Sequence, residues 1–320
     1  MTVKTAPLRV YTDDLEFFSG YIEKLAEEAR AGLPEALRRM RDHVSRFRGV
    51  SDDAIIAGEP AVADAQQVYA AEHGFGDWAS MVDYAEQISN GKREDPYIDF
   101  IHKVEAGDTH AVSDHLDRDA SLVNAIASTH NAPLHSAGNK EVAALLLERG
   151  ADAELETPLA GGTALMHALI WGWADVAEVI AAHSNYPSNL RVAAGLGDRA
   201  MLESMWTGQG QLTAEARDKR DYYRPNHGWF PWVPGGSDQE VLDEALIFAA
   251  VSGRIEAADR MLERGASIDG RAYNTTALLR AAWRGRIPMV DWLLDHGADI
   301  HGTGWLGGHA KGVTALHLAA

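Results

Sequence analysis

The side chains best suited to binding a ligand concentrate in one segment, residues 220–236. It holds five aromatic residues, three prolines, two arginines and one histidine in 17 positions. Aromatic and arginine side chains dominate binding hot spots, and prolines lower the entropy that a loop loses on ordering. We therefore predict an aromatic wall with two polar contacts, formed by Tyr222, Tyr223, Arg224, His227, Trp229, Phe230 and Trp232.

A purely structural interpretation of this segment stays open. The segment belongs to an aromatic insertion near residues 209–238, where it could replace packing contacts that an irregular part of the chain has lost. Long loops in compact arrays are often functional or disordered, and this one is too aromatic for ordinary disorder. Both interpretations, a binding loop and a packing patch, therefore remain.

Catalysis by this segment would rest on His227 as a general acid or base beside Tyr223 and Arg224. The sequence contains no phosphate-binding loop, no His-Glu-x-x-His, no Gly-x-Ser-x-Gly and no dinucleotide fingerprint. We therefore favour a protein that is not an enzyme. An enzyme or small-molecule receptor, with a pocket closed by residues 220–236, is the alternative.

Fourteen histidines raise the question of a metal site. The histidines nearest one another lack the i, i+4 spacing with a carboxylate partner, and the chain has no cysteine to supply thiolate ligands. We expect no metal and no cofactor.

Further candidate binding residues lie outside the aromatic insertion. Trp171, Trp283 and Arg284 fall at or near the ends of predicted helices, and Trp305 lies in a second insertion, residues 302–312. Tryptophan and arginine suit a partner surface. For each tryptophan, packing inside the fold is the alternative interpretation.

The elements that must position these residues recur along the chain. Counting from Thr276, Leu278 follows at +2, alanines at +5 and +6, and Gly285 at +9. The register fits again from Thr163, Ser188 and Glu244, restarts at Thr314, and is weaker from Ile98 and Ala132. An apolar second helix follows each first helix, and three of these end in a Gly-Ala turn. The sequence therefore predicts a stack of helix pairs.

This register resembles the ankyrin repeat, a turn and two helices of about 33 residues with a Thr-Pro-Leu-His-x-Ala opening. The resemblance implies an all-α ankyrin-repeat α-solenoid with short hairpin or loop fingers over residues 96–320. About six repeats and a truncated last one are expected. It also implies that His135 and His317 bond to a neighbouring turn. The Ala132 copy has a first helix that is about three residues short.

Residues 1–90 form a predicted N-terminal helical domain that caps the array. Gly32-Leu33-Pro34 divides two helices, a flexible stretch follows over residues 49–60, and two more helices flank Gly74-Phe75 with Asp77 as an N-cap. The segment resembles helical regions that precede ankyrin arrays in bacterial proteins. Five arginines between residues 38 and 48 are interpreted as a solvated face that offsets acids, with an anion site as the alternative.

The composition narrows the partners. The net charge of −18 argues against nucleic acid, and no run of about 18 apolar residues could span a membrane. The absence of cysteine and of a signal peptide favours the cytoplasm. We predict a protein-interaction scaffold that binds a protein or peptide with cationic and apolar features through the concave and finger surface, with a small molecule as the alternative ligand. Because the last repeat stops inside its first helix, we expect the natural chain to continue.

Overall fold

The computed structural model describes residues 8–10, 12–129, 131–156, 162–186, 188–218, 235–304 and 312–319. Within these residues every helix is an α- or 3-10 helix, and β-structure is limited to isolated bridges such as Ala272 with Thr275. The chain forms two compact units, one of Met1–Lys103 with His110–Asn131 and one of Val104–Thr109 with Ala132–Ala320. The predicted all-α fold class is confirmed.

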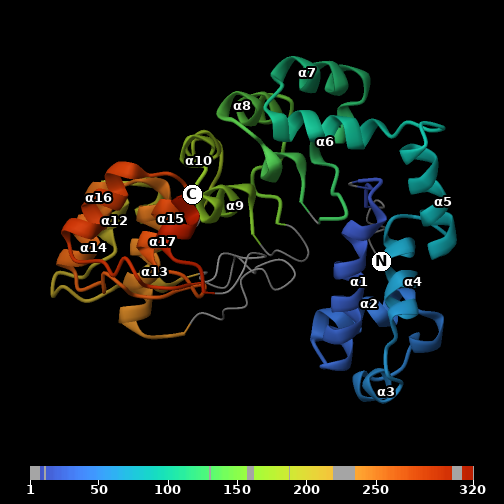
Figure 1. The fold of residues 1–320 in the computed structure, drawn as a ribbon, viewed down its shortest axis with the longest axis horizontal. Helices are drawn as coiled ribbons and strands as arrows, with labels where there is room; N and C mark the ends of the chain where they lie inside the picture. The colour runs from blue at the N-terminus through green and yellow to red at the C-terminus, as the bar shows by residue number, and fades with distance from the viewer. Residues whose placement is uncertain are drawn as a thin grey trace. The chain divides into compact units, whose positions relative to one another are not determined.

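The first unit is built from helices around one apolar core (Figure 1). Its buried side chains include Phe18, Leu25, Met40 and Tyr69, each at most 2% exposed. Its helices are α1 (Leu15–Arg30), α2 (Pro34–His43), α3 (Asp52–Ala57), α4 (Val62–Glu72), α5 (Trp78–Ser89), most of α6 (Pro96–Ala106) and α7 (Thr109–Arg118). The break between α1 and α2 and the Asp77 cap of α5 agree with the sequence prediction.

The prediction of a flexible stretch over residues 49–60 was wrong, because α3 forms there. The Ser51 side chain accepts a hydrogen bond from the Ala54 amide, and two aspartates occupy the first turn. An N-cap and acidic residues near a helix N-terminus stabilise even a short helix. Polar composition alone did not distinguish this helix from a loop.

Four of the five arginines between residues 38 and 48 pair with carboxylates; the interpretation of a solvated face was wrong for Arg39, which is 3% exposed. Arg38 pairs with Glu35 and Asp42, Arg39 with Glu72, Arg41 with Asp52, and Arg46 with Asp64. This face therefore offers a neutral network rather than a free cationic patch.

The second unit is a series of helix pairs. The first and second helices are η3 (Pro133–Ser136) and α8 (Lys140–Glu148), α9 (Ala164–Trp171) and α10 (Ala174–Ala181), α11 (Leu190–Leu196) and α12 (Arg199–Ser204), α13 (Asp238–Ser252) and α14 (Ile255–Glu263), and α15 (Ala277–Trp283) and α16 (Ile287–Asp295), followed by α17 (Ala315–Ala319). In Figure 1, α12, α14 and α16 lie along one side and α13, α15 and α17 along the other. The shortened copy at Ala132 forms only the 3-10 helix η3.

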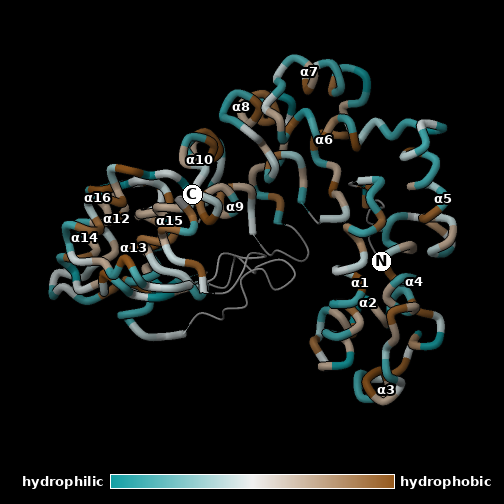
Figure 2. Tube along the Cα trace, in the orientation of Figure 1, coloured by the Kyte–Doolittle hydropathy of each residue, from teal (hydrophilic) through white to brown (hydrophobic). Residues whose placement is uncertain are grey.

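The residue types explain the pairing. Gly172, Gly197 and Gly253 end first helices in the left-handed conformation, with φ of 72°, 70° and 74°. Glycine adopts this conformation without the steric cost that a Cβ brings, so the chain can turn directly into the second helix. Hydrophobic and hydrophilic stretches alternate along the helices (Figure 2), as expected when one face packs against a neighbour.

A short hairpin before α15 illustrates how a finger is fixed. Ala272 and Thr275 form a bridge, and Tyr273 and Asn274 between them have φ of 54° and 57°. Two consecutive residues with positive φ are typical of the tight turn that joins two antiparallel strands. The turn places the Tyr273 side chain in the interior, where it is 2% exposed.

Of the helices described, none has the length and apolar character needed to cross a membrane.

Candidate partner-binding surface

Three of the predicted binding residues meet at the ends of two first helices. Trp171 ends α9 and Trp283 ends α15, and their ring centroids are 5.5 Å apart at 56°. The Arg284 guanidinium lies over the Trp283 ring, 5.3 Å from its centroid. All three side chains are half-buried. We call Trp171, Trp283 and Arg284 the tryptophan cluster.

The cluster depends on a close approach at Gly172, the residue after Trp171. A Cβ there would lie 2.6 Å from Cγ2 and 2.7 Å from the carbonyl oxygen of Val251, and 3.2 Å from Cγ of Arg284. The end of α9 therefore lies directly against the ends of α13 and α15. Only glycine fits this space without displacing backbone.

Arg286 ties the same helix ends together. Its guanidinium donates to the carbonyl oxygens of Gly172 at 2.7 Å and Val251 at 3.2 Å. C-terminal carbonyls of a helix lack partners within the helix, so a cation placed there satisfies them and complements the helix dipole. The Arg286 side chain thus acts as a cross-helix cap.

Histidines extend the cluster toward the preceding repeat. The His167 ring accepts a hydrogen bond from Nε1 of Trp171 at its Nε2, at 2.7 Å, and donates from Nδ1 to the carbonyl oxygen of His135 at 2.6 Å. The His135 ring bonds from Nε2 to the carbonyl oxygen of Gly162, as the resemblance implied for this position. These rings hold backbone and tryptophan in place.

The pH dependence of stability tests this role of His135. Burial lowers the pKa of His135 to about 4, and the ring is 2% exposed. A histidine that stays neutral in the fold but titrates at about 6.5 when unfolded stabilises above pH 6.5, and loses that contribution as pH falls toward 4. We expect the wild-type chain to lose about 1 kcal/mol more than His135→Gln in unfolding free energy between pH 7 and 5.5. Urea unfolding at both values measures it; equal losses contradict it.

Arg284 differs from its neighbours in its polar contacts. Burial lowers the pKa of Arg284 and the charge of Arg286 lowers it further, whereas the negative charge of Asp175 raises it. The Arg280 guanidinium also lies over the Trp283 ring, 5.0 Å from its centroid. Within the described part of the chain, the Arg284 guanidinium has no hydrogen bond and no carboxylate within ion-pair distance.

The other predicted binding residues lie outside the described residues. Trp305 falls in the stretch 305–311, and the aromatic insertion falls in 219–234, with Tyr222, Tyr223, Arg224, His227, Trp229, Phe230 and Trp232. The enzyme or receptor alternative rests on that stretch. The described residues therefore bear only on Trp171, Trp283 and Arg284.

Sequence reasoning missed Arg286 and Arg280. A signal for Arg286 was present, because Gly285-Arg286 repeats the Gly253-Arg254 step one helix pair earlier. Arg254 also reaches a carbonyl of a neighbouring first helix, that of Gly195 at 3.5 Å, and pairs with Glu178. An arginine after the helix-ending glycine thus marks a cross-helix cap in both repeats.

A buried ion pair lies deeper among the first helices. Arg191 of α11 and Glu244 of α13 are each 1% exposed at the side chain, with Nη1 and Oε1 3.0 Å apart. The Tyr273 hydroxyl donates to Glu244 and accepts from Arg191 at 2.9 Å. Burial raises the pKa of Tyr273, so the phenol keeps its proton. The three side chains join the hairpin before α15 to two first helices.

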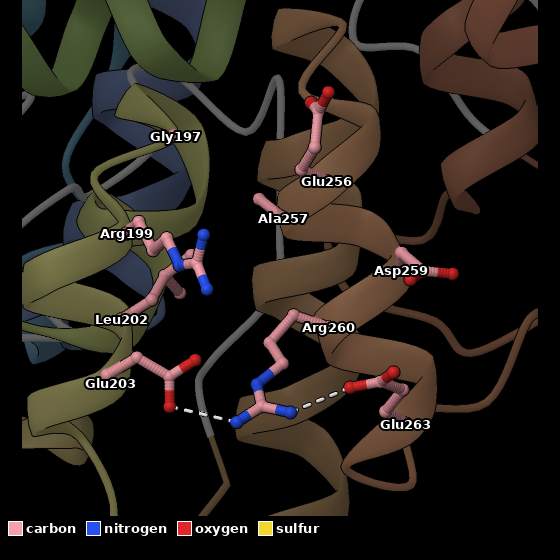
Figure 3. A pocket seen from close by; sticks show the side chains of 9 residues that line it. All are labelled: Gly197, Arg199, Leu202, Glu203, Glu256, Ala257, Asp259, Arg260 and Glu263. Atoms are coloured by element: carbon pink, nitrogen blue, oxygen red, sulfur yellow. Dashed lines mark hydrogen bonds and ion pairs between the residues drawn. The ribbon is translucent and has the colours of Figure 1, made fainter.

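A groove of about 560 Å³ lies between α12 and α14, on the second-helix side (Figure 3). Its floor includes Leu202 and Ala257, and its walls are charged. Arg260 spans its lower end, 2.8 Å from Glu203 and 2.7 Å from Glu263. The lining, as far as the structure describes it, contains no aromatic side chain. The tryptophan cluster is therefore the stronger candidate for partner binding.

No group of three or more histidine, aspartate or glutamate side chains within the described residues is arranged to hold a metal ion.

Comparison with known proteins identifies the repeat. Residues 246–294, from within α13 to within α16, match the family described as ankyrin repeats (many copies). The chain is also similar to the crystal structure of the human ASB11 ankyrin repeat domain, with 23% identity, 69% of this chain and 91% of that chain covered, and a TM-score of 0.33. A search of curated proteins found no match. The prediction of ankyrin repeats is thereby confirmed.

Proposed function

We propose that this chain, which contains ankyrin repeats, binds a protein or peptide through the tryptophan cluster. Ankyrin repeats are in general protein-interaction modules, so the scaffold fits this role. The observation that carries the site is the meeting of Trp171, Trp283 and Arg284, half-buried, at the ends of two first helices. The aromatic insertion, residues 220–236, is proposed to add further contacts.

The residue types support a binding surface. Tryptophan and arginine are enriched at binding hot spots, where a large rigid side chain gains contact area at low entropic cost. The half-buried Trp171 and Trp283 are already held in place by contacts within the fold, including the hydrogen bond from Trp171 to His167. Their exposed portions can therefore bind a partner without paying to become ordered. The lack of cysteine favours a reducing compartment, and we propose the cytoplasm.

Substitution of Trp171 tests the proposal. The full chain would be immobilised and used to select binders from a phage-displayed peptide library, and the selected peptides would be synthesised. We expect Trp171→Ala to weaken their binding at least tenfold, because removal of a hot-spot tryptophan costs roughly 2 kcal/mol or more. Fluorescence polarisation measures the dissociation constants.

Trp292→Ala provides the matched control. Trp292 is also half-buried, but it lies on α16 and stacks on His296 with ring centroids 4.1 Å apart. We expect this variant to bind the selected peptides as the wild type does. Thermal melting of both variants would separate lost binding from lost folding. Peptides that bind Trp171→Ala and wild type equally would refute the site.

A further inference from the structure

We propose that the partner segment carries a carboxylate that binds Arg284, next to an apolar side chain that packs on Trp171 and Trp283. This inference rests on the proposed function and adds the chemistry of the partner. It concerns an acidic segment of another protein, in which an aspartate or glutamate neighbours an aromatic or aliphatic residue.

Arg284 has N–H donors available for a partner. A guanidinium carries five N–H groups and cannot lose its proton in a protein. Within the described residues none of those on Arg284 is hydrogen-bonded, although the side chain is half-buried. A partly desolvated cation without an acceptor is unfavourable, so an incoming acceptor gains more there than at an exposed arginine.

Other partly buried arginines of the same unit have partners within the fold. Arg254 pairs with Glu178, Arg260 with Glu203 and Glu263, and Arg286 with two helix carbonyls. Each of these guanidinium groups thus has at least one acceptor within the fold. Arg284 departs from this pattern at the position where two tryptophan rings meet.

The local charge around Arg284 is positive. The stretch 277–286 contains three arginines and no acidic residue, in a chain with a net charge of −18. Arg280 is buried at 1% exposure, so Arg284 and Arg286 form a small cationic spot on an acidic protein, with Asp175 as the acidic group whose charge acts on Arg284. The overall charge favours a basic partner, whereas this spot favours an acidic group at the point of contact. A single partner can be basic overall and still place one acidic group at Arg284.

These observations favour a carboxylate with an apolar neighbour. The planar guanidinium matches a carboxylate through two parallel N–H···O bonds and can keep its place over the Trp283 ring. The Trp171 and Trp283 rings lie beside it, and an apolar side chain can pack on them. The surface therefore fits a partner segment in which an anionic side chain and an apolar side chain are adjacent.

The test uses two pools of synthetic dodecapeptides that share the same randomised aromatic and aliphatic positions. One pool has aspartate or glutamate at its polar positions, and the other has asparagine or glutamine. We expect the wild-type full chain to retain the acidic pool at least tenfold more than the amide pool. General electrostatics oppose this result, because the chain is strongly negative. Arg284→Gln is expected to abolish the preference, and Arg284→Lys to reduce it.

Arg199→Gln is the matched control, because it removes the same charge from an exposed arginine of the same unit. It is expected to keep the preference. If the wild-type chain binds the two pools equally and Trp171→Ala weakens both, the carboxylate inference is overturned and the proposed function stands. Binding that ignores Trp171→Ala would overturn both. Melting temperatures of the Arg284 variants near that of the wild type exclude a folding effect.

Discussion

Replacing Glu244 with leucine is expected to lower the free energy of unfolding by about 3–5 kcal/mol, because it leaves the buried Arg191 without this carboxylate. Both side chains are 1% exposed, so water cannot replace the lost partner. The Tyr273 hydroxyl also loses its acceptor. Urea unfolding of the full chain, followed by circular dichroism, measures the change.

The reason for the loss is tested by removing both charges. Arg191→Met with Glu244→Leu is expected to recover most of the stability, because a buried pair replaced by apolar side chains of similar volume is often nearly neutral. Tyr273→Phe keeps the charges and is expected to cost only about 1–2 kcal/mol. A double variant as unstable as Glu244→Leu alone would show that shape, and not the loss of the ion pair with Glu244, governs this site.

The repeat register was predictable because it is local. Leu278, the small residues after it and Gly285 recur at fixed offsets, and each offset reflects a demand of one helix pair. The cap of α5 was predicted in the same way, since Asp77 accepts a hydrogen bond from the amide three residues ahead. Asn189 caps α11 through the same contact but was not predicted. Helix boundaries of this kind could therefore be predicted from residues that are close in the sequence.

The Arg191–Glu244–Tyr273 network could not be read in the same way. Arg191 and Glu244 are 53 positions apart, and the residues between them include the aromatic insertion that interrupts the register. A charged residue within a helix suggests solvent exposure, and only the packing of α11 against α13 shows that both charges are buried. Long-range partners of this kind carry no periodic signal.

The tryptophan cluster was predicted as separate residues and not as one site. Trp171 and Trp283 were chosen for residue type and for their places at helix ends. Their meeting requires α9 to approach α15 although α11 and α13 lie between them in the chain. Gly172 makes that approach possible. In the sequence it was recognisable only as the glycine that ends α9, and its close contact with Val251 could not be predicted.

The contact at Gly172 leads to the second large effect, the cost of adding one methyl group there. Gly172→Ala is expected to lower the unfolding free energy by about 2–5 kcal/mol. Roughly 1–2 kcal/mol comes from a left-handed alanine and about 1–3 kcal/mol from overpacking against Val251. The new Cβ would lie 2.6 Å from Cγ2 of Val251 and 2.7 Å from its carbonyl oxygen.

Gly285→Ala separates the two causes. Gly285 also has a positive φ, 62°, but a Cβ there would meet no atom within 4 Å. Its substitution should therefore show the conformational cost alone, about 1–2 kcal/mol. A Cβ at Gly172 would also lie 3.2 Å from Cγ of Arg284, whereas one at Gly285 crowds no side chain of the tryptophan cluster. We therefore further expect Gly172→Ala, and not Gly285→Ala, to weaken the binding of peptides selected on the tryptophan cluster. Equal destabilisation by the two substitutions would mean that α9 does not rest against α13, and the cluster would lose its structural basis.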